Sequence, residues 1–147
     1  MRKVCASFIL LAAAARAAAP DISEFMAANM TTLRDEDGDA ADWIEIRNPG
    51  SKPRSLAGWH LTDDPGELDK WTFPAVSLPG GGYLVVFASG KNRRDPAGNL
   101  HTNFRLNAGG EYLALVEPGG KAVAREFAPA FPPQKTDFSY GIGLRMW

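Results

Sequence analysis

After residue 20 the chain repeatedly places a short run of strand-forming residues before a turn, and this rhythm constrains the fold more than any other sequence feature. Residues 43–47 alternate apolar and charged side chains and stop at the turn sequence Asn-Pro-Gly. Residues 111–116 and 121–125 flank Glu-Pro-Gly-Gly, a spacing typical of a hairpin. About seven to nine such short strands predict an all-β fold, an immunoglobulin-like β-sandwich with a barrel as the alternative.

One strand and one long gap stand out within this rhythm. Residues 83–87 read Tyr-Leu-Val-Val-Phe without a polar member, so we predict a strand that is buried on both faces. The chain between Ala88 and Phe104 is polar, and a loop of that length in a compact domain is functional or mobile. No internal repeat and no linker divides the chain, so residues 20–141 are predicted to form one domain.

The first nineteen residues have the form of a secretory signal peptide. A basic start at Arg2 and Lys3 precedes an apolar run over residues 4–15, and small residues at alternate positions follow. The run is too short for a spanning helix, which needs about 20 apolar residues, although an uncleaved anchor or a buried helix is the alternative. We therefore predict a signal peptide at 1–19 and an exported protein, extracellular, periplasmic or at the cell surface. No membrane span is expected after cleavage.

Charge and cysteine content narrow the function classes further. The chain has 16 Lys and Arg against 17 Asp and Glu, and removing residues 1–19 leaves 13 against 17. A nucleic-acid partner is not expected, because such proteins carry a basic face. The single cysteine, Cys5, lies in the predicted signal peptide, so the exported chain would have no disulfide and no thiol nucleophile.

Six short motifs in order along the chain resemble those of the bacterial lamin tail domain. They are residues 22–29, 35–48, 56–63, 71–74 with 82–88, 103–107 with 110–115, and 139–141. The resemblance runs over about residues 21–141 and implies an immunoglobulin-like sandwich and a non-catalytic module. Bacterial modules of this kind occur on exported proteins, often beside nucleases, phosphatases or spore-coat-like kinase domains. No heptad pattern is present, so the filament role of nuclear lamins is not expected here.

The C-terminal residues depart from the family pattern. Bacterial members usually continue past Ser-Tyr-Gly with a Pro-rich segment that ends in Pro-Gly-x-x-Asn, whereas this chain stops at Trp147. Residues 142–147 are therefore expected to be a C-terminal tail, and the chain either ends there naturally or is the front part of a larger exported protein that has been truncated.

The sequence offers no recognised catalytic spacing. It contains no His-Glu-x-x-His zinc motif, no Gly-x-Ser-x-Gly nucleophile motif and no phosphate-cradling loop, and we predict that it is not an enzyme. His60 stands beside a tryptophan in a strand pattern and is predicted to face solvent. His101 falls in the long polar loop and is predicted to be solvated.

The strongest candidate for site chemistry is an acidic stretch around Gly38. Asp35, Asp37 and Asp39 match positions 1, 3 and 5 of an EF-hand loop, and Asp42 adds a fourth carboxylate. Calcium takes six to eight oxygen ligands, which alternating carboxylates on a turn can supply. Calcium is the only cofactor that the sequence suggests.

The EF-hand pattern then fails, which keeps a second interpretation open. Position 6 is Ala40 rather than Gly, and position 12 is Ile46 rather than Glu. The alternative is a solvated turn, in which Asp-Gly is favoured for its backbone geometry. A second acidic stretch at residues 63–69 would add ligands if the two stretches met in space.

Aromatic and basic residues give a further candidate surface. Trp59 is predicted to lie in the core, by analogy with the buried strand tryptophan of sandwiches. Trp71 is predicted to be an exposed platform, with Arg93 and Arg94 of the long loop as further ligand-binding residues.

The function expected from the sequence is that of a monomeric, non-catalytic, exported binding or structural module. Its partner would be a protein or a cell-surface glycan. The alternatives are an accessory domain of a larger exported enzyme and a calcium-dependent adhesion or carbohydrate-binding module.

Overall fold

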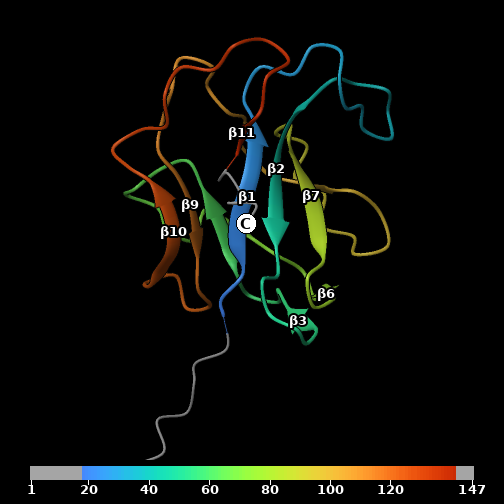
Figure 1. The fold of residues 1–147 in the computed structure, drawn as a ribbon, viewed down its shortest axis with the longest axis vertical. Helices are drawn as coiled ribbons and strands as arrows, with labels where there is room; N and C mark the ends of the chain where they lie inside the picture. Colours follow the sequence, from blue (N-terminus) through green and yellow to red (C-terminus); the bar gives the residue numbers. More distant parts are fainter. Residues whose placement is uncertain (1–17, 142–147) are drawn as a thin grey trace, which may run out of the picture.

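A computed structural model describes residues 18–141, which form eleven β-strands and no helix that is long and apolar enough to cross a bilayer (Figure 1). The predicted signal peptide at 1–19 lies outside the described residues except for Ala18 and Ala19, and the tail 142–147 lies wholly outside them. The strands are β1 (Asp21–Met26), β2 (Asp42–Arg47), β3 (Arg54–Ser55), β4 (His60–Thr62), β5 (Trp71–Thr72), β6 (Ser77–Leu78), β7 (Tyr83–Ala88), β8 (Leu100–His101), β9 (Leu113–Val116), β10 (Val123–Phe127) and β11 (Tyr140–Gly141).

Two main sheets form the sandwich. One has five strands in the order β11-β1-β2-β7-β8, and the other has four in the order β10-β9-β4-β5, with a separate β3-β6 pair. The all-β, immunoglobulin-like architecture predicted from the sequence is confirmed. The described residues contain more strands than the seven to nine expected, because five of the eleven have only two residues and show no readable alternation.

The core lies between the two sheets and is built by alternation along the longer strands. In β2, Ile44 and Ile46 are buried while Glu45 between them is half-buried on the other face. Ile44 pairs with Phe25 of β1 and with Val86 of β7, so one apolar row crosses three strands. Each fully buried aliphatic or aromatic side chain contributes about 1.5–3 kcal/mol relative to an exposed one.

The predicted hairpin is confirmed, and the chain after it is part of the fold. β9 and β10 pair antiparallel around residues 117–122. Phe131 then inserts into the core with 2% of its surface exposed, and its N–H donates to the Glu111 carbonyl at 2.8 Å. Gly110, at φ +97°, lies so close to the Phe131 carbonyl that a side chain at this position would collide with that oxygen. β11 then pairs with β1 and forms the edge strand of the five-stranded sheet.

The prediction for residues 83–87 is only half right. β7 is a strand, but Tyr83 at its start is 48% exposed and burial on both faces is reached only from Val86 onward. The second half of β7 is buried on its outer face because His101 covers it. The His101 ring stacks on Phe87 with ring centroids 5.2 Å apart. The apolar run thus predicts the burial of the second half of β7 correctly and does not predict the exposure of the first half.

The long polar segment after β7 contains a strand that the sequence did not reveal. β8 runs parallel to β7, with Val86 paired to Leu100 and Phe87 paired to His101. The chain therefore leaves β7 at Ala88, forms a loop and returns to the edge of the same sheet (Figure 1). This return holds residues 89–99 near the turn that precedes β2, since β2 and β7 are paired neighbours.

Candidate functional site

The acidic segment, residues 34–42, is organised around the buried carboxylate of Asp35. Its Oδ1 accepts hydrogen bonds from the backbone N–H groups of Asp37 and Asp39, each at 3.0 Å. The backbone closes a turn from the Gly38 N–H to the Asp35 carbonyl, and Gly38 takes φ +82°. The Asp-Gly turn that the sequence suggested is therefore present, with an aspartate side chain at its centre.

Three carboxylates of this segment converge on one ammonium group. Lys91 Nζ lies 2.5 Å from Asp35, 2.6 Å from Asp37 and 2.8 Å from Asp39. These hydrogen bonds, the one to Asp35 foremost, hold the pKa of Lys91 well above its usual range. Lys91 follows β7, so the parallel return of the chain places the lysine over an acidic turn more than fifty residues earlier.

The pKa of Asp35 shows that hydrogen bonding outweighs burial at this carboxyl group. Burial alone would raise the pKa of the carboxyl, but the hydrogen bonds from Lys91 and from the backbone of Asp39 and Asp37 outweigh it. The pKa therefore lies below its ordinary value, and Asp35 is held as a carboxylate.

A second set of contacts holds Glu36. Asn99 Nδ2 donates to one of its oxygens at 2.9 Å, and Arg93 lies 2.5 Å from the other. The hydrogen bond from Asn99, then that from its own backbone N–H and that from Arg93, hold the pKa of Glu36 far below its usual range. Arg93 also pairs with Asp37 at 2.7 Å, which joins the two sets into one network.

His101 lies beneath this network and is fully buried, so the prediction that it is solvated is wrong. Its Nδ1 lies 2.8 Å from Ser89 Oγ, and its Nε2 lies 3.0 Å from Glu36. The ring thus connects the end of β7 to the acidic segment. Sequence reasoning missed both Ser89 and His101, because only the pairing of β8 with β7 brings them together.

His60 is also buried rather than exposed. It belongs to β4, an inner strand of the four-stranded sheet, and its Nδ1 lies 3.0 Å from Thr72 Oγ1. Burial lowers the pKa of His60. Alternation predicted a surface position because it cannot show that Gly120 and Asp69 lie close to the ring.

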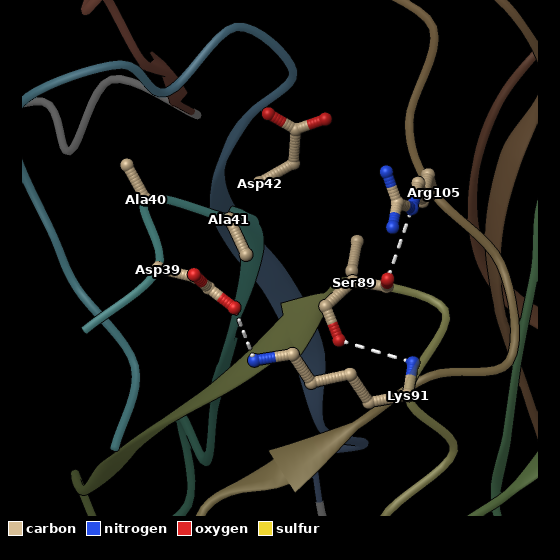
Figure 2. A pocket seen from close by; sticks show the side chains of 8 residues that line it. Asp39, Ala40, Ala41, Asp42, Ser89, Lys91 and Arg105 are labelled. Carbon is tan, nitrogen blue, oxygen red and sulfur yellow. Dashed lines mark hydrogen bonds and ion pairs between the residues drawn. The ribbon is translucent and has the colours of Figure 1, made fainter. Parts of the chain in front are cut away.

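A hollow of about 420 Å³ opens beside the network (Figure 2). Four charged side chains line it: Asp39, Asp42, Lys91 and Arg105. The remaining lining residues are small: Ala40, Ala41, Ala88 and Ser89. Arg105 Nε donates to the Ser89 carbonyl at 3.0 Å, and Asp42 Oδ1 accepts the Asn29 N–H at 3.1 Å. Burial raises the pKa of Asp42.

The four aspartates predicted to hold calcium are only partly brought together. Among the described residues, Asp35, Asp37 and Asp39 offer oxygens within 4.8 Å of one another, and Asp42 joins no such group. The Lys91 ammonium stands where these three carboxylates converge, so a calcium ion would have to displace it. With one oxygen from each, the three carboxylates supply three ligands, so second carboxylate oxygens, carbonyls or waters would have to complete the six to eight that calcium takes. Calcium binding by this chain remains a prediction.

Asp35, Glu36 and His101 form a second group with ligand atoms within 4.8 Å. Its members are already committed to protein partners, Glu36 to Arg93, Asn99 and His101, and Asp35 to Lys91. The group acts in this structure as a connection between chain segments.

The second acidic stretch, residues 63–69, contributes to neither of these groups within residues 18–141. Asp63 pairs with the neighbouring Lys70 at 2.6 Å. Asp64 Oδ1 accepts the Gly66 N–H at 2.8 Å, which closes a local turn. These two contacts join residues that are at most seven positions apart in sequence.

The prediction that Trp71 is an exposed platform is wrong. Its side chain is fully buried and packs edge-on against Phe73, with centroids 4.9 Å apart, because β5 turns this residue toward the core. Trp59 lies in the core as predicted. Arg94 rests 5.9 Å over the Trp71 ring, whereas Arg93 binds the acidic segment, so these three residues do not form one site.

Comparison with known proteins adds the family. The family model described as Lamin Tail Domain matches residues 13–127, well over half of the chain. A comparison with curated proteins found no match. With the sandwich fold observed over residues 18–141, the chain belongs to the lamin tail domain family.

Proposed function

We propose that this chain is an exported, non-catalytic binding module that holds a protein or cell-surface glycan at one end of the sandwich. The binding surface is the charged end, defined as the acidic segment 34–42 together with loop residues 89–99 and Arg105. Export is proposed from the signal-like residues 1–19, and the binding role from the charged end.

The observation that carries this proposal is the cross-linking of two distant loops into one surface. Lys91 and Arg93 bind four carboxylates of the acidic segment, and the backbone turn around Asp35 keeps those carboxylates in place. Loops that carry binding function are commonly positioned by a rigid scaffold. Pre-ordered loops also lose less conformational entropy on binding.

The Ser89–His101–Glu36 line is the arrangement that comes nearest to catalytic machinery, and we assign it a structural role. Ser89 is buried, and its Oγ also accepts the Lys91 N–H at 3.2 Å. Glu36 is held by Arg93 and Asn99 as well as by His101. A nucleophile needs a free approach for substrate and an oxyanion-stabilising group. Ser89 lines the hollow with only 5% of its surface exposed, and its Oγ is already engaged by His101 and by the Lys91 N–H.

The test is binding of the fluorescently labelled chain to envelope preparations of the cell that exports it, with purified wall polysaccharide and envelope protein as separate arms. Arg105→Glu inverts a charge at the charged end, and Lys52→Glu makes the same change beyond the opposite end of β2. We expect Arg105→Glu to weaken binding by about tenfold, a loss of about 1.4 kcal/mol, while Lys52→Glu binds normally. Absence of binding to every fraction, or equal loss in both variants, would overturn the proposal. A chelator arm separates the calcium-dependent alternative.

A further inference from the structure

Two opposite charges line the hollow beside the charged end without touching each other (Figure 2). Arg105 uses its Nε to bind the Ser89 carbonyl, and no group within residues 18–141 is bonded to its two terminal nitrogens. Asp42 uses Oδ1 to accept the Asn29 N–H, and no described group donates to Oδ2. Each side chain is therefore fixed at one point and open at the other.

The fixed points give both groups a defined direction. The Ser89 carbonyl belongs to the chain at the end of β7, which an isolated bridge joins to Arg105. Asp42 begins β2, and Ala88, its partner in register on β7, also lines the hollow. The two charges thus stand on paired backbone, so their separation does not depend on a flexible loop.

The charge balance of the hollow selects for a ligand that carries both signs. Two acidic and two basic side chains line it, and one pair, Asp39 with Lys91, is already joined at 2.8 Å. A simple anion bound to Arg105 would meet Asp42, and a simple cation bound to Asp42 would meet Arg105. A zwitterion satisfies both groups at once, because guanidinium recognises carboxylate through two parallel hydrogen bonds and carboxylate accepts from ammonium.

The remaining lining sets the size of the ligand. The volume of about 420 Å³ lies in the range of small-molecule sites, roughly 300–1,000 Å³. Ala40, Ala41 and Ala88 contribute methyl groups to the wall, so an aliphatic side chain has apolar surface to contact.

We propose that the hollow binds the α-amino-acid group, an ammonium and a carboxylate on one carbon, with Arg105 holding the carboxylate and Asp42 the ammonium. This inference rests on the proposed function, since it assigns a ligand to the charged end. The group is supplied by a free amino acid or by a polymer branch that carries it.

The first test varies the ligand. The whole chain, labelled with nitrogen-15, is titrated by NMR with L- and D-alanine, lysine and glycine, then with the N-acetyl and amide derivatives of the best binder. Each derivative removes one charge, and we expect each to bind about tenfold more weakly than the parent. A lysyl branch on a soluble peptide, free at its α-ammonium and α-carboxylate, distinguishes a polymer-borne group from a free amino acid.

The second test varies the protein. Asp42→Asn keeps the oxygen that accepts the Asn29 N–H and removes the charge, and Arg105→Met removes the guanidinium. We expect both to lose amino-acid binding, while Lys52→Met, which removes a charge beyond the opposite end of β2 and outside the hollow, binds normally. Resonance dispersion and the unfolding midpoint verify that each variant is folded. A variant that does not fold is replaced by its conservative counterpart, Asp42→Glu or Arg105→Lys, in which weakened binding is again expected.

The outcomes separate this inference from the proposed function. If no amino acid perturbs resonances of the hollow at about 10 mM, or if the acetyl and amide derivatives bind as well as the parent, the amino-acid inference is overturned. If envelope binding in that case still depends on Arg105, the proposed function stands without it.

Discussion

The chain contains two acidic stretches of similar composition, and they fold into different structures. In residues 34–42, one aspartate is buried and three converge on a lysine that lies more than fifty residues away in sequence. In residues 63–69, the Asp64 side chain caps a local turn and Asp63 pairs with Lys70, which directly follows the stretch. Both stretches contain the turn-forming residues that their composition predicts.

The difference lies in what the rest of the fold brings to each turn. The parallel return of β8 delivers Lys91, Arg93 and Asn99 to the first stretch, and nothing comparable binds the second among the described contacts. Acidic density therefore does not by itself define a site. A distant cation converts one acidic turn into an ordered surface.

The largest effect should follow from removing the centre of the first turn. Asp35→Ala deletes the acceptor for two backbone N–H groups and leaves Lys91 without its most buried partner, which we expect to cost about 2–4 kcal/mol of unfolding free energy. Asp64→Ala, the matched change in the second stretch, removes one exposed cap and should cost at most about 1 kcal/mol. Urea denaturation measures both, and equal losses would remove the distinction between the stretches.

Acid should lower the unfolding free energy by protonating the carboxylates of the first stretch. The pKa values of Asp35, Glu36 and Asp37 lie below their ordinary values of 3.8, 4.5 and 3.8. Folded-state pKa values below the unfolded ones give stability that is present above the unfolded pKa and is lost as pH falls through the folded pKa. We therefore expect a plateau in unfolding free energy above about pH 5.5 and a decline below it.

The control for this pH profile is the chain with Asp35→Asn, Glu36→Gln and Asp37→Asn together. Urea denaturation at each pH should give a flatter decline in this variant than in the parent. An equally steep decline would assign the acid sensitivity to other groups.

A smaller effect should appear when the Lys91 ammonium is removed by substitution and calcium is added. Lys91→Gln frees three carboxylates at the point where they converge, so about 1 mM calcium should raise the unfolding midpoint of the variant by several degrees. The parent, whose ammonium fills that point, should show little response. A larger response in the parent than in the variant would contradict the assigned role of Lys91 and favour the calcium site predicted from sequence.

The smallest effect on stability should come from Asp42, whose charge opposes folding, unlike the charges of Asp35, Glu36 and Asp37. Burial raises the pKa of Asp42, so its ionised form is disfavoured in the fold, and this stability term is lost as pH rises through the folded pKa. Asp42→Asn should therefore be neutral or stabilising at pH 7, by at most about 1 kcal/mol. Thermal unfolding at pH 7 and near pH 3 measures this, and destabilisation at pH 7 would show that the charge supports the fold.

Features of the fold that depend on neighbours in sequence were predictable. The alternation around Ile44 and Ile46 gave β2 its correct bounds within one residue, and the Glu-Pro-Gly-Gly turn gave the β9–β10 hairpin. Trp59 was predictable as a core residue by analogy with the buried strand tryptophan of sandwiches. Motif order identified the family, which the family model confirms.

The parts of the site that depend on distant pairing were not predictable. Trp71 looked exposed because a two-residue strand gives no alternation from which to read its inner face. His101 looked solvated because β8 is equally short and pairs in parallel with a strand that ends twelve residues earlier. Four aspartates looked like one ligand set, and only the fold shows that Asp42 lies outside the group formed by Asp35, Asp37 and Asp39.

The position of Phe131 has a consequence for where this domain can be divided. The family match ends at residue 127, four residues before a ring that packs against Phe25 with centroids 4.8 Å apart. Beyond it, Asp137 accepts hydrogen bonds from the backbone of Met30 and Thr31, and β11 extends the larger sheet. A protease cut or a gene fusion at residue 127 would thus remove Phe131 from the core and leave the outer edge of β1 without its β11 partner. A junction after residue 141 would keep both contacts.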